Sequence, residues 1–157
     1  MATYTAARAA AGFPVFKGAG GGQLCAAWGT VEIATALAAN DVVQLCRVPR
    51  GATVIGGWLY GDDIDTGTET LDMDIGWADN GVDAADPDGF GNFGVMDGDT
   101  IAQFKPVAGL IYPFQGVLLT DGPKTFSAET IIELDVNAAA NAGGTGTLSA
   151  VVYYVVP

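Results

Sequence analysis

The sequence of 157 residues contains no histidine, only two cysteines and only six basic residues. Without histidine the chain lacks the commonest general base and the imidazole ligands of zinc sites. Serine and cysteine triads of the usual form are excluded for the same reason. The sequence therefore predicts a protein that is not an enzyme, and it leaves open only metal sites built from oxygen ligands.

Long hydrophobic runs are absent as well, and none approaches the roughly 18 apolar residues of a membrane-spanning helix. The N-terminal segment has Arg8 inside its alanine run and Pro14 soon after it, a pattern that fits poorly with a signal peptide. We therefore expect a protein that is made and kept in a cytoplasm and has no membrane partner. In that compartment Cys25 and Cys46 are expected to be reduced, buried residues rather than a disulfide.

The scarcity of Lys and Arg leaves a formal net charge of −12. Twelve of the 18 acidic residues lie between Asp62 and Asp99, and no basic residue lies between Arg50 and Lys105. The other six acids balance the six basic residues, so this one region carries the whole net charge. Because Lys and Arg do not cluster anywhere, we expect no binding to nucleic acid through its phosphates.

The chain is nevertheless apolar. Half of the residues are hydrophobic and only 15% are charged, against roughly 25% in an ordinary soluble domain. This composition is unusual for a free monomer, so we expect the surplus apolar surface to contact protein.

Alternating apolar residues predict β-strands. In the acidic segment Asp62–Asp79, apolar and polar residues alternate from Leu71 to Trp77, which is the period of a half-buried strand. Further strands are expected at Leu24–Ile33, Asp41–Val48, Thr53–Asp62, Ile101–Phe104, Gly116–Leu119, Thr130–Val136 and Thr147–Val156. No segment of ten residues has an amphipathic helical period. The predicted fold is all-β, an antiparallel, jelly-roll-like β-sandwich of seven or eight short strands.

The sequence makes specific structural predictions for three segments and for one glycine. Residues 1–23 are rich in Ala and Gly and predict an extended N-terminal arm, with one helical turn at Thr5–Ala11, ahead of a sandwich domain over residues 24–157. Gly29 is a candidate β-bulge, and residues 80–99 are expected to be mostly loop. Thr147–Val156 is apolar on both faces, so we expect a central strand or a subunit contact there.

The density of carboxylates in the acidic region suggests calcium binding as a hypothesis. An EF-hand alignment with Gly89 at the sixth position fails, because Ala84 and Val95 then stand where carboxylates are required. Looser sites stay possible at Asp62, Asp63 and Asp65 or at Asp83, Asp86 and Asp88. A solvated acidic face is favoured over both, so no metal and no cofactor is expected.

Aromatic residues could line a carbohydrate or protein site. The six considered are Trp28, Trp58, Trp77, Phe90, Phe93 and Phe114. Trp58 and Trp77 lie in strand patterns, and both are expected in the core. Carboxylate pairs for glycoside hydrolysis are uninformative here, because twelve clustered acids always contain a pair at some suitable distance.

Several segments carry a family resemblance: Met1–Tyr4, Asn40–Ala52, Asp62–Gly67, Leu71–Gly76 and Glu129–Ile132, followed by the C-terminal strand. In these strand and turn patterns the chain resembles small virion proteins of tailed bacteriophages that are encoded among head genes. The resemblance implies a β-sandwich that decorates or cements the outside of the capsid, with the major capsid protein as its partner. Symmetric seams between coat subunits further suggest a homodimer or homotrimer.

A decoration protein needs apolar contact area and a means to grip its neighbours. We expect the arm and one end of the sandwich to make these contacts while the acidic loops face solvent. The expected contact residues are Tyr4, Arg8, Phe13, Phe16, Phe90, Phe93 and Tyr153. Two alternatives stay open: a tail- or fibre-associated protein that binds host glycan, and a β-sandwich enzyme that acts on polysaccharide.

Overall fold

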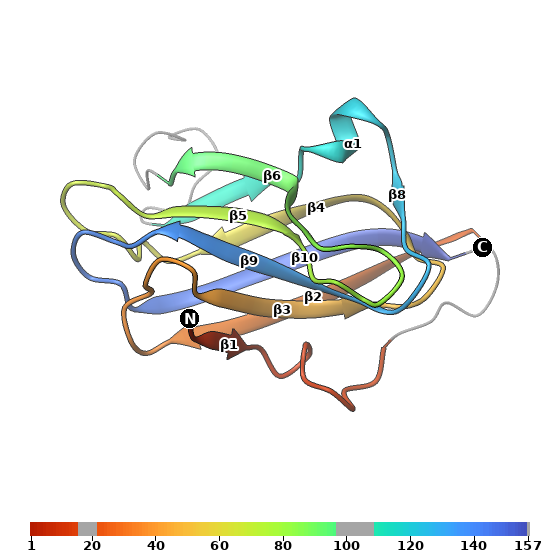
Figure 1. Ribbon diagram of the computed structural model, residues 1–157, viewed down its shortest axis with the longest axis horizontal. Coiled ribbons are helices and arrows are strands. Elements are labelled where there is room, and N and C mark those ends of the chain that lie inside the picture. Colours follow the sequence, from red (N-terminus) through yellow and green to blue (C-terminus); the bar gives the residue numbers. More distant parts are fainter. Residues whose placement is uncertain (16–21, 97–108, 157) are drawn as a thin grey trace.

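Two β-sheets packed face to face make up the described part of the chain, residues 1–15, 22–96 and 109–156 of a computed structural model (Figure 1). The strand orders are β1-β3-β9-β5-β6 and β2-β10-β4-β7, with the short β8 paired to β4. The strands are β1 (Thr3–Thr5), β2 (Gln23–Ile33), β3 (Val42–Val48), β4 (Thr53–Gly61), β5 (Asp72–Trp77), β6 (Asp86–Val95), β7 (Leu110–Pro113), β8 (Lys124–Thr125), β9 (Thr130–Ala138) and β10 (Gly146–Val156). The one helix found in these ranges, α1 (Val117–Thr120), is far too short to cross a membrane.

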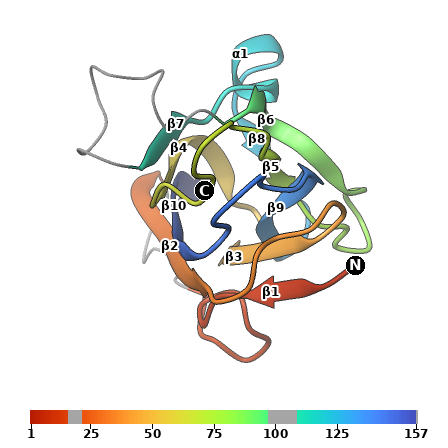
Figure 2. The same ribbon diagram turned by 90° about the vertical axis from the view of Figure 1, so that its left-hand side faces the viewer.

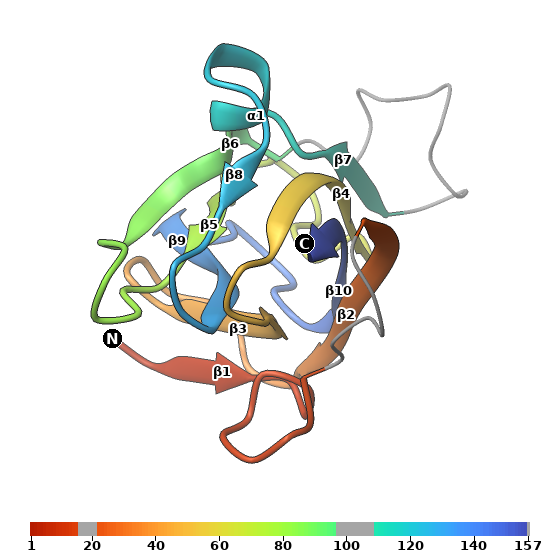
Figure 3. The ribbon, with the colours of Figure 1, turned by 90° about the vertical axis from the view of Figure 1, so that its right-hand side faces the viewer.

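The strands are connected as in a jelly roll. When β1 and β8 are set aside, the remaining eight strands, counted along the chain, lie in the orders 1-8-3-6 and 2-7-4-5. All neighbours among these eight are antiparallel. Figures 2 and 3 look along the sandwich from its two ends and show the two layers. The predicted all-β, jelly-roll-like sandwich is therefore confirmed.

The core lies between the sheets and is built by the predicted alternation. The four apolar residues expected to point inward are all buried: Leu71, Met73, Ile75 and Trp77. The ring of Trp77 packs against Phe90 and Phe126, with centroids 5.0 and 5.3 Å apart. Cys25 and Cys46 are buried free thiols, as expected. The two-faced strand β10 is central in its sheet, between β2 and β4.

The prediction that residues 80–99 are mostly loop is wrong, because β6 occupies residues 86–95. Its glycines suggested a loop, but they serve close packing instead. A Cβ placed at Gly89 would lie 2.1 Å from the Trp77 ring, and one at Gly91 would lie 2.4 Å from the Phe93 ring. The aromatic rings fill the space beside the backbone, so a glycine-rich strand still packs densely.

Two smaller predictions are also wrong. The segment expected to be a strand at residues 116–119 begins α1, because Gly116 at φ 55° turns the chain. Gly29 lies in a regular stretch of the β2–β10 ladder and forms no bulge. A Cβ at Gly29 would lie 1.7 Å from the carbonyl oxygen of Leu45, so glycine is required there for the two backbones to approach. The strand expected at residues 101–104 lies outside the described residues.

Over residues 1–15 the N-terminal segment lies on the sandwich, and the division into an arm over residues 1–23 and a sandwich domain over residues 24–157 stays a prediction. β1 pairs in parallel with β3, at the edge of its sheet. The backbone N–H of Ala2 donates to Asp41 Oδ1 at 2.6 Å, and Ala6 and Ala9 are buried. The chain makes a turn after Ala6, closed by the Ala9 N–H to Ala6 O bond of 2.9 Å, in place of the expected helical turn. Residues 16–21 of the expected arm lie outside the described residues.

Candidate functional site

The outer face of the β2-β10-β4-β7 sheet is apolar and aromatic. Strand register places Val151 of β10 between Trp28 of β2 and Trp58 of β4, and Pro113 of β7 continues the same row. The next row holds Tyr153 beside Ala26 and Gly56, and the one after it holds Val155 beside Leu24 and Thr53. These side chains point away from the core, because their sequence neighbours point into it.

This face leaves large hydrophobic side chains in solvent. Leu24 is 65% exposed, Trp28 48% and Ile55 46%. The other outward residues of the rows are half-buried against one another. Contiguous exposed apolar side chains of this kind are typical of interaction surfaces. We name the set Leu24, Ala26, Trp28, Ile55, Trp58, Pro113, Val151, Tyr153 and Val155 the apolar face.

The outer face of the opposite sheet is acidic. Register places Asp74 of β5 directly beside Asp135 of β9, in a row that continues to Asn92 of β6. Glu133 lies in the neighbouring row and accepts a hydrogen bond from Gln44 Nε2 at 3.2 Å. The sandwich therefore has two faces of opposite chemistry, and its acids lie on strands as well as in loops.

The acidic face keeps carboxyls in a partly desolvated setting. Asp74 is only 6% exposed, and its Oδ2 accepts a 2.8 Å hydrogen bond from Asn137 Nδ2. Within the described residues, Asp74 Oδ1 and Asp135 Oδ2 are buried without a hydrogen-bond partner. Burial raises the pKa of Asp74, Glu133 and Asp135 on this face, and neighbouring acids raise it further in all three. At the end of β6, burial and the neighbouring Asp88 raise the pKa of Asp86 in the same way.

Buried acids elsewhere have the opposite shift. Burial would also raise the pKa of Asp65, but backbone hydrogen bonds outweigh it and lower the value. Backbone N–H groups of Ala38 and Ala2 lower the pKa of Asp41, and the Asn80 side chain lowers that of Asp83. These three carboxylates hold loops together and so stabilise the fold in their charged form.

The two sets predict a stability maximum at mildly acidic pH. A carboxyl with a raised folded pKa costs stability at neutral pH, and that cost disappears as the pH falls through the folded value. A carboxyl with a lowered pKa contributes stability that is lost as the pH falls below about 4, its unfolded value, through the folded one. We expect the urea midpoint to rise as the pH is lowered from 7 through the raised folded pKa values, and to fall again below about 4. A midpoint that declines at every step from pH 7 to pH 3 would contradict this.

A metal centre finds no support in the geometry. No group of three acidic or cysteine side chains in residues 1–15, 22–96 and 109–156 is arranged to hold an ion. In the first candidate set from the sequence, Asp65 accepts hydrogen bonds from backbone N–H groups. In the second, Asp83 accepts hydrogen bonds from the Asn80 side chain and the Ser127 N–H and lies 4.0 Å from Lys124 Nζ. That the protein is not an enzyme stays a prediction.

The predicted contact residues are dispersed. Phe90 has no exposed surface and belongs to the core, so its side chain is removed from the contact set. Phe93 packs against Tyr112, with centroids 4.7 Å apart, and Tyr4 packs half-buried on the core. Phe16 lies outside the described residues. Arg8, Phe13 and Tyr153 are the members that lie on or beside the apolar face.

The sequence interpretation missed most of this face. Trp77 is buried as expected, but the prediction that Trp58 is a core residue is wrong, because it lies on the outer side of β4 and is only partly buried. The signal was present in the sequence. The β4 and β10 segments are both apolar on two faces, and two such strands side by side in one sheet make an apolar outer surface.

Comparison with known proteins places the fold. No protein-family model and no curated protein matches the sequence. A chain in the capsid of Ralstonia phage GP4 has a TM-score of 0.75, with 19% identity over 99% of both chains. A chain in the cyanophage Pam1 capsid asymmetric unit has a TM-score of 0.63, with 24% identity over 92% of this chain and 93% of that one. This protein shares their fold.

A third solved structure is similar over a smaller part. A chain in the acidic stable capsid structure of Helicobacter pylori bacteriophage KHP30 has a TM-score of 0.53, with 15% identity over 85% of this chain and 89% of that one. In all three comparisons the alignment covers most of both chains. The shared unit is therefore the whole jelly roll and not a local strand motif.

Proposed function

We propose that this protein is a bacteriophage capsid decoration protein that binds the outside of the head through its apolar face and cements the shell. The observation that carries the proposal is the difference between the two outer faces of the sandwich. One face holds aromatic and aliphatic residues, and the other holds carboxylates. The fold similarity to chains of three phage capsid structures supports a place in the capsid. In this proposal the major capsid protein is the partner, and the virion exterior is the location.

The distribution of charge favours decoration over a coat role. A subunit that forms the shell itself must contact neighbours around its whole perimeter, whereas this sandwich presents one apolar surface and, on the opposite sheet, a face with close, like-charged acids. A one-sided binder attaches by the apolar face and leaves the acidic face in solvent. The outward negative charge also discourages adhesion to nucleic acid and to anionic cell surfaces.

Cementing follows from binding that spans neighbouring coat subunits. A protein that binds only the assembled shell stabilises it by mass action, so heads with the protein resist heat and osmotic shock better than heads without it. Self-association as a dimer or trimer, which remains part of the proposal, would add contacts across a seam.

Reconstitution tests the function. The protein is added to heads prepared without it, and bound copies are counted by quantitative mass spectrometry against the major coat protein. We expect saturable binding at a fixed ratio within a few-fold of the coat, together with a higher temperature of head disruption. A handful of copies in virions, with binding to cells or glycan instead, would overturn the proposal and favour the tail-associated alternative.

A further inference from the structure

β2 is a long edge strand that has a paired strand on one side only among the described residues. It has 11 residues and pairs along its whole length with β10 on one side. On the other side, the described residues include no strand paired with β2, and the Leu45 carbonyl that a Cβ at Gly29 would meet lies against the inner face of the strand, not at its edge. Residues 23–28, where the groove described below lies, therefore have no backbone partner on that side among the described residues. An open edge of this kind presents N–H and C=O groups ready to pair with another strand.

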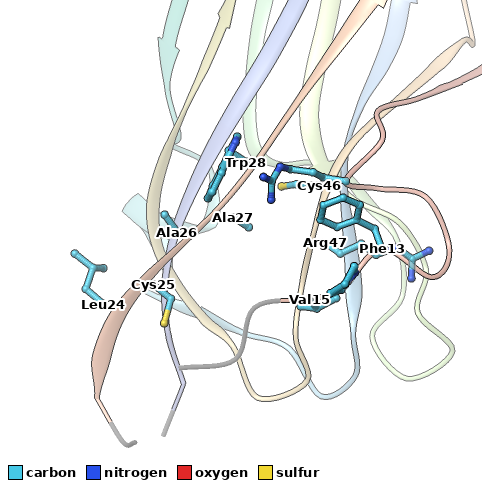
Figure 4. A pocket seen from close by; sticks show the side chains of 11 residues that line it. Phe13, Val15, Leu24, Cys25, Ala26, Ala27, Trp28, Cys46 and Arg47 are labelled. Atoms are coloured by element: carbon cyan, nitrogen blue, oxygen red, sulfur yellow. The ribbon is translucent and has the colours of Figure 1, made fainter. Parts of the chain in front are cut away.

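A groove of about 790 Å³ runs along this open edge. Its strand side is lined by the five consecutive residues from Leu24 to Trp28, and such a lining arises along the edge of a strand, because neighbouring side chains point to opposite faces. Its other side is the N-terminal segment, and Figure 4 shows Phe13 and Val15 of that segment across the groove from the strand. Cys25 and Cys46 are buried within the lining, so most of the groove is apolar.

The N-terminal segment that forms the outer wall of the groove is held in place by side-chain contacts. The Arg8 guanidinium stacks on the Trp28 ring at 3.9 Å from its centroid and lies 5.0 Å from that of Phe13. Arg47 Nε donates to the Ala9 carbonyl at 2.7 Å, and its other end pairs with Glu129. The groove is therefore preformed, which lowers the entropic cost of filling it.

The shape of the groove selects one extended segment. Paired strands lie about 4.8 Å apart, so a strand added to the β2 edge must fit between that edge and the wall. The β2 edge of a second copy carries an N-terminal segment of its own beside it, which an extended coat segment lacks. Ala26 and Ala27 leave room for apolar side chains, and the Arg8 guanidinium in the lining favours a segment that is neutral or acidic.

We infer that the open edge of β2 accepts an extended apolar segment of the capsid coat protein, which adds a strand to the β2-β10-β4-β7 sheet. The groove is continuous with the apolar face, since Leu24, Ala26 and Trp28 belong to both. Backbone pairing supplies affinity, and the groove lining selects the side chains, as in other strand-addition complexes. This inference rests on the proposed function and names the part of the coat that the protein recognises.

A charge placed in the groove tests this inference. Val15→Asp puts a carboxylate in the apolar wall without touching the apolar face, and it is expected to weaken binding to heads about tenfold, or 1.4 kcal/mol. Val82→Asp is the matched control, because Val82 is 69% exposed in a loop outside the groove, and it should bind as the unmodified protein does. Unchanged binding of Val15→Asp would overturn the strand-acceptor inference and leave the proposed function standing. Failure of the unmodified protein to bind heads would overturn both.

Crosslinking identifies the occupant. Phe13 is replaced by a benzophenone-bearing phenylalanine, the variant is bound to heads, and the crosslinked peptides are mapped after irradiation. We expect crosslinks to one continuous coat segment of a few residues, absent when the same group replaces Val82. Crosslinks only to other copies of this chain, or scattered over many coat segments, would overturn the inference.

Discussion

Asp65→Ala is expected to lower the free energy of unfolding by about 4 kcal/mol, because it strips the acceptor from several buried donors at once. Asp65 is 2% exposed. Its Oδ2 accepts the backbone N–H groups of Thr70 and Leu71 at 2.6 and 2.7 Å, and its Oδ1 accepts those of Asn141 and Ala142 at 2.9 and 3.4 Å. One carboxylate therefore ties the turn before β5 to the loop that leads into β10.

Urea denaturation of the variant at pH 7 measures the effect. Asp63→Ala is the matched control two residues away, since the described residues offer Asp63 no hydrogen bond, and its midpoint should stay close to that of the unmodified protein. The loss from Asp65→Ala should shrink as the pH falls below about 4, because the stability contributed by a carboxylate with a lowered folded pKa is lost progressively below its unfolded value. Equal urea midpoints for the Asp65 and Asp63 variants would show that the two loops stay together without the Asp65 carboxylate.

The role of Asp65 also shows a limit of prediction from sequence. Asp65 and Asp63 are two of twelve acids in one region, and both were assigned to a possible calcium site or a solvated face. What separates them is a loop more than 70 residues later whose N–H groups converge on Asp65. Periodicity reports which way a strand residue points, but it carries no information on contacts between distant loops.

The jelly roll itself was predictable because each step is local. Strands of alternating polarity, turns with Gly and Pro, and the lack of helical period all point to a sandwich. The apolar face was only partly predictable. The two-faced β10 was recognised, but its neighbour β4 was assigned to the core, because strand order must be known before two apolar outer surfaces can be joined into one.

Changes on the apolar face should have the largest effect on function. Ile55→Glu places a carboxylate where the proposed interface excludes water, and it is expected to weaken binding to heads about 100-fold, or about 3 kcal/mol. Trp58→Ala removes the aromatic residue next to the centre of the face and should cost about thirtyfold, as buried tryptophans at interfaces commonly do. Neither residue lines the β2 groove, so these variants test the face separately from the strand acceptor.

Leu119→Glu is the control that separates a specific interface from general stickiness. Leu119 on α1 is 74% exposed, more than Ile55 at 46%, and it lies outside the apolar face. The same loss of apolar surface and the same added charge should therefore leave binding unchanged if the apolar face is the binding surface. Equal losses of binding for Ile55→Glu and Leu119→Glu, with urea midpoints unaltered, would mean that added charge alone weakens binding. A loss of binding for Leu119→Glu alone would place the interface at the α1 end of the sandwich. Co-sedimentation titrations with heads lacking the protein distinguish these results, because each predicts a different order of dissociation constants.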